Sequence, residues 1–135
     1  MENKDVVGNI VGVGIIGCKG KYLVLKRSSD STFYPGVYEP LCIFLKEFES
    51  PGQSVLRQLK EKTGLNGKVM KPGKIFEVRD EHGRWIVVPF LIEVNSDKVK
   101  LSREHTDFKW VNMDELDNDE FIRGIKKDFA SVGLV

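Results

Sequence analysis

Residues 34–65 read YPGVYEPLCIFLKEFESPGQSVLRQLKEKTGL, and they contain the clearest structural pattern in the chain. Ser50 is a natural N-cap, and the proline that follows it suits the first position of a helix. An apolar stripe at helical spacing comes next, formed by Val55, Leu56 and Leu59. Gly64 is a typical stop signal after a last helical turn. These signals predict a helix over residues 51–63.

The segments before this helix have the composition of strands. Residues 10–18 are apolar and β-branched, and KYLVLK at 21–26 resumes after Lys19-Gly20. This pattern predicts a β-hairpin with a tight glycine turn. Residues 37–45 are predicted to form a third strand.

After the helix, residues 74–79 and 84–94 look like two strands joined by a turn at 80–83, and 108–111 like another. The run WIVVPFLIEV is apolar on both alternations, which predicts cover on both faces, and its Pro89 suggests a bulge or an edge position. Residues 119–132 form an amphipathic pattern that predicts a second helix. Its inward side chains would be Phe121, Ile122, Ile125 and Phe129. The predicted order β-β-β-α-β-β-β-α suits one α/β domain over 1–135, with helices packed on a mixed sheet.

Composition bounds the class of protein. The chain has 135 residues with 21 basic and 20 acidic side chains, so its formal net charge is +1. This balance gives no reason to expect a nucleic-acid or membrane partner. No apolar run approaches a membrane span, and MENKDVVGN lacks the features of a secretory signal. Cys18 and Cys42 have no metal-binding spacing and are expected to be buried thiols. A cytoplasmic protein is the expectation.

Three glycines match a dinucleotide-binding pattern by spacing alone. Gly12, Gly14 and Gly17 follow the order G-x-G-x-x-G. That motif requires a helix directly after the glycines, whereas a turn and a second strand are predicted here. We therefore interpret these glycines as small residues on one strand face that leave room for a packed neighbour.

The segment quoted first resembles the signature of the Nudix hydrolase family, G-x5-E-x7-R-E-U-x-E-E-x-G-U, where U is a bulky apolar residue. Without a gap, the matching positions are Glu49, Arg57, Leu59, Glu61, Gly64 and Leu65. Pro35-Gly36-x-Tyr38-Glu39 resembles the entry to this signature in many members. Glu104-His105, Phe108-x-Trp110-Val111 and Asp114-Glu115-Leu116 resemble the family's closing strand and short helix. The resemblance covers about residues 6–116 and implies a Nudix-like α/β/α sandwich with a mixed β-sheet.

The chain also departs from this signature. Its first glycine falls on Ile43 and the glycine before it on Cys42, so a loop is replaced by strand-forming residues. The glutamate after the arginine is Gln58, and the second glutamate of the late pair is Lys62. An acidic position often found in the preceding loop is Lys46. Glu49 and Glu61 are the acidic positions of the signature that remain.

Helix geometry explains why these departures affect chemistry. Residues 58, 61 and 62 share one helix face, with β-carbons about 5–6 Å apart. The resemblance implies that three carboxylates there hold Mg²⁺ or Mn²⁺ for pyrophosphate hydrolysis, because such ions take oxygen ligands and bridge phosphates. In this chain the face carries one amide, one carboxylate and one ammonium. We therefore expect it to bind a divalent metal weakly.

Several side chains are candidates for a site, each beside a plainer interpretation. Carried over from the family, Glu61, Arg57 and Gln58 would be catalytic, and Glu49 with Glu61 would form a weak metal site. Lys62, Glu39 and Lys46 are the candidate ligand-binding residues. Arg57 and Glu61 could instead be a simple ion pair, Glu49 could favour the helix dipole, and Lys62 could be solvated. His82 and His105 are expected to be structural.

Two functions remain open at this point. One is a Nudix-fold protein with weak or no hydrolytic activity that binds a nucleotide-like or diphosphate ligand, with no metal cofactor required, or serves as an interaction module. The other is a Mg²⁺- or Mn²⁺-dependent hydrolase of nucleoside diphosphates linked to another moiety. It would use Glu49, Glu61 and an outside carboxylate such as Glu47, Glu104 or Asp107. The partner is a small molecule in either case, and a homodimer is left open.

Overall fold

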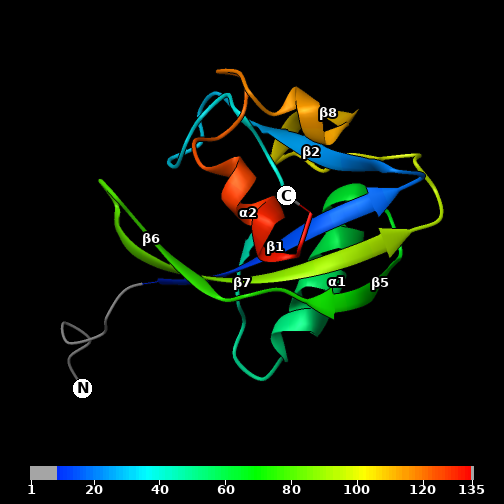
Figure 1. The fold of residues 1–135 in the computed structure, drawn as a ribbon, viewed down its shortest axis with the longest axis horizontal. Helices are drawn as coiled ribbons and strands as arrows, with labels where there is room; N and C mark the ends of the chain where they lie inside the picture. The colour runs from blue at the N-terminus through cyan, green and yellow to red at the C-terminus, as the bar shows by residue number, and fades with distance from the viewer. Residues whose placement is uncertain (1–8, 135) are drawn as a thin grey trace.

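The computed structural model describes residues 9–134, which form a strongly twisted sheet flanked by helices (Figure 1). The predicted hairpin is present as β1 (Asn9–Cys18) and β2 (Lys21–Arg27). Its turn residues Lys19 and Gly20 both lie in the left-handed region, at φ 54° and 81°. The other strands are β3 (Tyr38–Glu39), β4 (Leu41–Phe44), β5 (Gly67–Pro72), β6 (Phe76–Asp80), β7 (Gly83–Val94) and β8 (His105–Val111). The helices are α1 (Pro51–Thr63), the short 3-10 helix η1 (Met113–Glu115) and α2 (Ile125–Ser131).

The sheet is mixed, as expected. β1 runs parallel to β7 along most of its length, whereas its pairings with β2 and β4 are antiparallel. β2 and β4 pair with different parts of β1: β4 pairs with residues 11–14, and β2 with residues 17–18. The chain continues from β4 through a short loop into α1, so this split in the sheet determines where α1 begins.

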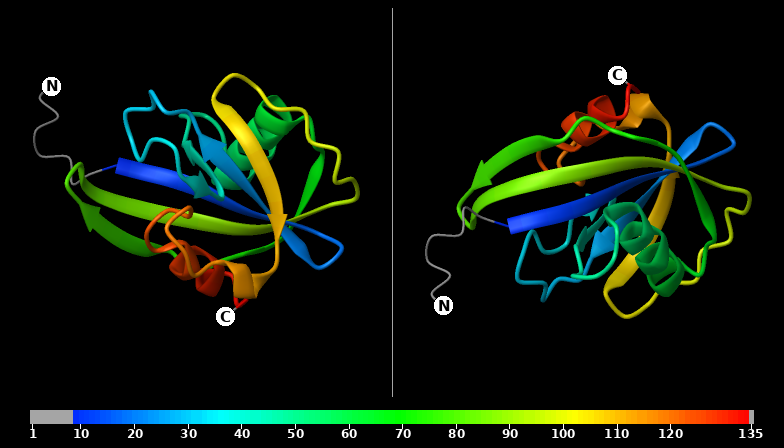
Figure 2. Two further views of the ribbon diagram at one scale, coloured as in Figure 1. Left: turned by 90° about the horizontal axis from the view of Figure 1, so that it is seen from above. Right: turned by 90° about the horizontal axis from the view of Figure 1, so that it is seen from below.

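The two longer helices lie on opposite faces of the sheet (Figure 2). The core is correspondingly divided into two clusters. Beside α1 lie Ile16, Leu41, Ile43, Val55, Leu59 and Ile92, among others. Beside α2 lie Val11, Ile15, Val24, Val87, Ile125 and Phe129, among others. β7 supplies residues to both clusters, so the prediction that both of its faces are covered is confirmed, as is the α/β/α sandwich.

The glycines of β1 make room for α1. A β-carbon on Gly12 would lie 2.9 Å from Val55, and one on Gly14 would lie 3.0 Å from the same residue. The interpretation of these glycines as small residues under a packed neighbour is confirmed for Gly12 and Gly14. It is wrong for Gly17 in that the three glycines do not share one face, because Gly17 alternates to the other side of β1 and lies against Tyr22 of β2.

α1 has the predicted bounds, but α2 does not. The Ser50 hydroxyl accepts a hydrogen bond from the Gln53 backbone N–H, and Gly64 takes φ 75° at the C-terminal end of α1. The predicted helix over 119–132 is wrong in its first half, because α2 begins at Ile125 after Gly124 turns left-handed at φ 84°. Phe121 instead forms a bridge with Tyr38 and is buried there without being helical.

Three strand predictions also need correction. The strand expected over residues 37–45 is interrupted at Pro40, β5 was not anticipated, and β8 begins at His105, earlier than expected. Pro89 lies at neither an edge nor a bulge of its own. It stands where β7 exchanges its partner β5 for β6. Its carbonyl accepts a hydrogen bond from the Gly73 backbone N–H at 2.8 Å, so the missing N–H is on the side of the connection between those two strands.

Within residues 9–134, no helix is long and apolar enough to span a membrane. Cys18 is buried and Cys42 half-buried, and both thiols are free. The N-terminal residues in which no signal was expected, 1–8, lie outside the described range, as does the start of the segment that resembles the family.

Candidate functional site

Arg57 occupies the centre of the charged groups on α1. Its Nε and Nη2 donate to the two carboxylate oxygens of Glu49 at 2.7 and 2.9 Å, and its Nη1 donates to Glu61 at 2.7 Å. The bond to Glu61 follows from the i, i+4 spacing on the helix. Glu49 precedes the N-cap, and from there its side chain reaches the guanidinium from the loop side.

These bonds link Glu49, Arg57 and Glu61 into a triad and shift the pKa values of Glu49 and Arg57. The hydrogen bonds from Arg57 hold the pKa of Glu49 below its usual range. The same bonds raise the pKa of Arg57, with the bond to Glu49 as the larger cause. Glu49 is therefore ionised, and both carboxylates already have the guanidinium as their partner.

Lys62 and Glu104 form a second ion pair on the adjacent part of this face. Their Nζ and Oε2 atoms are 2.9 Å apart, and only 15% of the Lys62 side chain is exposed. The hydrogen bond from Lys62 lowers the pKa of Glu104. The plain interpretation of Lys62 as a solvated lysine is therefore wrong, because its ammonium is held against a carboxylate from a distant segment.

Residues 100–104 form a strap over the end of α1. The backbone N–H of Lys100 donates to the Thr63 carbonyl at 2.9 Å, and that of Ser102 donates to the Lys62 carbonyl at 3.1 Å. These bonds satisfy carbonyls in the last turn of the helix, where intrahelical partners end. They also bring Glu104 to Lys62, although 42 positions separate the two in the sequence.

A hollow of about 380 Å³ lies between α1 and the strap. It is lined by Gln58, Glu61, Lys62, Ser102, Arg103 and Glu104. All six side chains are polar, and the two cations balance the two anions. Three of the proposed residues thus meet at one surface, together with Glu104. Ser102 and Arg103 were not predicted from the sequence, where their only signal is their position next to the family-like Glu104-His105.

Glu39 lies elsewhere, in a buried ion pair. Its carboxylate accepts two hydrogen bonds from Arg27 Nη1 at 2.9 and 2.8 Å, and only 2% of the residue is exposed. His105 Nε2 is 3.5 Å from the same carboxylate, while His105 Nδ1 is buried with no hydrogen-bond partner among residues 9–134. In this arrangement Glu39 is occupied by Arg27.

The remaining candidates are scattered. Gln58 makes a long hydrogen bond of 3.4 Å to the Phe44 carbonyl. Lys46 is exposed, and its charge contributes to the lowered pKa of Glu49, after the bonds from Arg57. Asp107 accepts hydrogen bonds from Tyr38 and from the Phe108 backbone, which keep its pKa low. Glu104 and Asp107 are both carboxylates from outside the helix with a bonding partner, and of these two Glu104 is the one at the α1 face.

An aromatic cluster adjoins the start of this face. Phe33, Phe44, His82 and Trp85 have neighbouring ring centroids 4.8 to 6.5 Å apart. Phe44 is 55% exposed, and its backbone carbonyl is the acceptor for Gln58. The rings pack mostly edge to face, and the exposed ring of Phe44 belongs to the residue that bonds Gln58 of the hollow.

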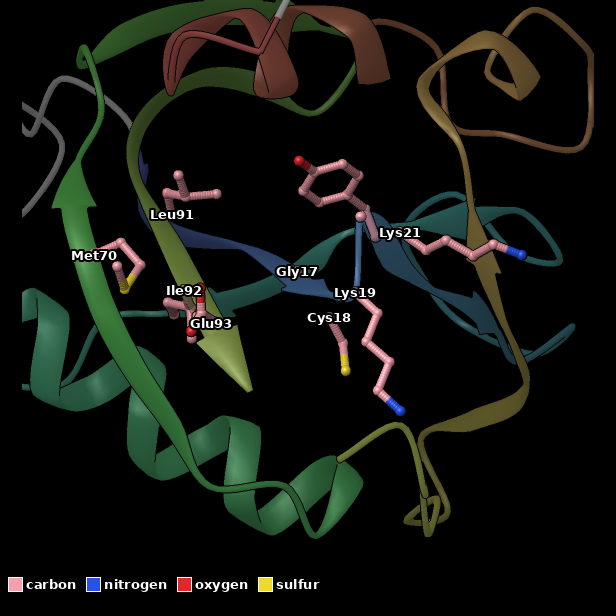
Figure 3. Close-up of a pocket in the computed structure, with 10 residues that line it drawn as sticks. Gly17, Cys18, Lys19, Lys21, Met70, Leu91, Ile92 and Glu93 are labelled. Carbon is pink, nitrogen blue, oxygen red and sulfur yellow. The ribbon is translucent and has the colours of Figure 1, made fainter. Parts of the chain in front are cut away.

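A separate hollow of about 210 Å³ lies at the β1–β2 turn, next to β5 and β7. Figure 3 shows that the ammonium groups of Lys19 and Lys21 point in different directions there, with Lys21 turned away from Met70 and Leu91. Because its charged groups do not converge, this hollow offers no comparable binding chemistry.

Comparison with known proteins agrees with this fold. Residues 8–130 match the NUDIX domain. The chain belongs to the NUDIX domain family. A comparison with curated proteins finds no significant match.

Solved Nudix structures have the same architecture. A MutT protein from Methanosarcina mazei Go1 is 25% identical, with a TM-score of 0.78 over 90% of this chain and 88% of that one. A MutT NUDIX hydrolase from Burkholderia pseudomallei is 15% identical, with a TM-score of 0.75 over 92% and 97%. A bifunctional NMN adenylyltransferase/ADP ribose pyrophosphatase from Francisella tularensis is 16% identical, with a TM-score of 0.75 over 91% of this chain and 40% of that one.

Nudix proteins typically use a divalent metal, which requires a suitable set of donor atoms. Mg²⁺ needs several oxygen ligands in nearly octahedral order. Within residues 9–134, no three His, Cys, Asp or Glu side chains are grouped so that they could hold a metal ion. The oxygens of Glu49 and one oxygen each of Glu61 and Glu104 accept from Arg57 and Lys62. In this arrangement the donor set does not fit a divalent metal.

Proposed function

We propose that this Nudix protein binds a nucleoside-diphosphate-like ligand over α1 and has weak or no pyrophosphohydrolase activity. The binding surface would be the hollow between α1 and the strap. In this proposal Glu61, Arg57 and Gln58 occupy the family's catalytic positions without a functional metal cluster, and Glu49 with Glu61 forms at most a weak metal site.

One observation carries this proposal: the carboxylates at the α1 face are bound by the chain's own cations. Arg57 holds Glu49 and Glu61, and Lys62 holds Glu104. A divalent ion would have to displace both cations before it gained enough ligands. Because charge-assisted hydrogen bonds are roughly twice as strong as neutral ones, that displacement opposes metal binding.

Lys62 supplies what a metal would otherwise provide, which is a fixed positive charge at the hollow. With 15% of its side chain exposed, its position is restricted, so less entropy is lost when an anion binds. The exposed ring of Phe44 supports the nucleotide-like part of the proposal, since aromatic side chains can stack on the face of a base. We propose no direct contact for the buried Glu39, whereas Lys46 lies exposed on the loop that leads to the helix.

Metal titration tests this proposal. We expect calorimetry with Mg²⁺ and with Mn²⁺ to show millimolar or weaker binding, and a hydrolysis screen over nucleotide sugars, dinucleotides and nucleoside triphosphates to show little turnover. Glu61→Gln serves as the matched variant. A tight stoichiometric site that disappears in Glu61→Gln would refute the proposal.

A second candidate is a working metal-dependent hydrolase, and the position of Glu104 favours it. Glu61 and Glu104 line the same hollow, so a metal that displaced Lys62 would find two carboxylates there. Metal-dependent turnover that is lost in Glu104→Gln would support this candidate.

A further inference from the structure

We propose that Glu104 is a displaceable counterion, which holds Lys62 in the resting protein and is replaced there by the ligand's diphosphate. This inference rests on the proposed function and adds a competition within the site. Glu104 would thereby limit the ligands to anions that carry more than one negative charge.

The two partners of this ion pair differ in their freedom to move. Only 15% of the Lys62 side chain is exposed, against 60% of the Glu104 side chain. When the pair opens, the carboxylate can turn into water and keep its hydration, whereas the ammonium remains at the hollow. The geometry therefore identifies Glu104 as the partner that leaves.

The strap can release the carboxylate without unfolding. The backbone of the strap is fixed to α1 through Lys100 and Ser102. His105, which follows Glu104, is buried. A rotation of the Glu104 side chain alone is sufficient. Side-chain rotations of exposed residues cost little and are fast.

The other polar groups of the hollow favour a diphosphate as the replacement. Arg103, Ser102 and Gln58 line it together with Lys62 and can donate hydrogen bonds. Glu61 lines it as well, with one oxygen held by Arg57, and its negative charge opposes anions. A single carboxylate would only replace one negative charge by another, whereas a diphosphate brings more charge and more acceptor atoms.

The test is isothermal calorimetry with inorganic pyrophosphate, in chelator and at low ionic strength. We expect Glu104→Gln to bind pyrophosphate about tenfold more tightly than the wild type, because the competing charge is gone. Glu81→Gln removes the same charge from the β6–β7 turn and is expected to change affinity less than twofold. Acetate at the same concentration is expected not to compete.

Two further variants make the test specific. Lys62→Met is expected to lose pyrophosphate binding, and the double variant Lys62→Met/Glu104→Gln is expected not to recover it. Glu104→Ala provides a second route if the amide perturbs the strap, and thermal unfolding checks that each variant folds. Unchanged or weaker binding in both Glu104 variants, a gain that persists without Lys62, or effective competition by acetate would overturn the inference.

The outcomes separate this inference from the proposed function. If the wild type binds ADP-ribose without metal but neither Glu104 variant tightens pyrophosphate binding, the counterion role fails and the proposed function stands. If neither the wild type nor any variant binds ADP-ribose or pyrophosphate without metal, the counterion role and the proposed function both fail.

Discussion

Arg57 decides the electrostatics of the α1 face because of its shape. A planar guanidinium can donate to two carboxylates at once in a fixed geometry, which a lysine cannot do. Here each of its three nitrogens donates to Glu49 or Glu61, at 2.7 to 2.9 Å. The arginine therefore joins the loop before α1 to the middle of the helix.

Asp128 gives a prediction on pH. This half-buried carboxyl on α2 has its pKa raised to about 7, chiefly by burial and then by the charge of Glu39. The folded protein thus takes up a proton that the unfolded chain, with an aspartate pKa of about 3.9, releases. Stability contributed by this group is present at about pH 4 and is lost as the pH rises to about 7.

We expect Asp128→Asn to be more stable than the wild type at about pH 8, on the order of 2 kcal/mol, since each pKa unit corresponds to about 1.4 kcal/mol and the residue keeps some solvent contact. Near pH 4 the difference between the two proteins should be much smaller. Urea unfolding at several pH values measures both. A difference that stays constant across this range would contradict the raised pKa.

Residue-level predictions from the sequence succeeded where helix spacing determines the contact. The Arg57–Glu61 pair follows from i, i+4 geometry and is present. The Lys62–Glu104 pair could not be derived in this way, because its partners come from separate elements and meet only through the strap. The roles proposed for these residues remain predictions.

At the scale of elements, local signals predicted α1 well and α2 poorly. Ser50 begins α1 and Gly64 ends it, through bonds and backbone angles that depend only on residues nearby in the sequence. In the second helix, Gly124 interrupts an apolar pattern that otherwise continues from Phe121 to Phe129. Phe121 is apolar because it is buried against Tyr38 in a segment that is not helical, so an apolar residue at this position does not indicate a helix. β5 was missed because most of its residues are exposed and its sequence lacks strand alternation.

Contact between β1 and α1 can be tested at Gly12. A β-carbon there would lie 2.9 Å from both Leu45 and Val55, so one of them must shift. We expect Gly12→Ala to lower the free energy of unfolding by about 1–3 kcal/mol, the usual cost of overpacking a core. Gly52→Ala is the control, because a β-carbon there meets Phe90 at an ordinary 3.5 Å and alanine favours a helix. Equal stability of the two variants in urea would contradict this packing.

The α1 face itself can be changed toward the family's acidic pattern. Gln58→Glu with Lys62→Glu adds two carboxylates and frees Glu104. We expect this double variant to bind Mn²⁺ more tightly than the wild type but to gain little turnover, because Leu41–Phe44 continues as a strand where the signature has a glycine loop. Calorimetry and a pyrophosphate-release assay check the two parts. Robust hydrolysis would show that β4 does not limit catalysis.

At the scale of the molecule, the split in the sheet brings the residues of the site together. β4 leaves β1 and leads into α1, while β8 pairs with β2 and is preceded by the strap. Residues 58–62 and 102–104 therefore meet at the C-terminal half of α1. The chain's net charge of +1 offers no general attraction for anions, so binding of a diphosphate depends on local cations. Such binding should weaken with added salt, because charges are screened over about 8–10 Å at physiological ionic strength.

The most direct test of a fixed lysine charge in place of a metal is calorimetry with ADP-ribose in chelator. We predict that the wild type binds without metal, that Lys62→Ala binds more weakly, and that Lys62→Glu binds weakest because attraction becomes repulsion. Lys60→Glu, on the same helix but outside the hollow, should bind nearly as well as the wild type. Metal-free binding that neither Lys62 substitution changes, or binding by the wild type only when Mg²⁺ is added, would contradict the account.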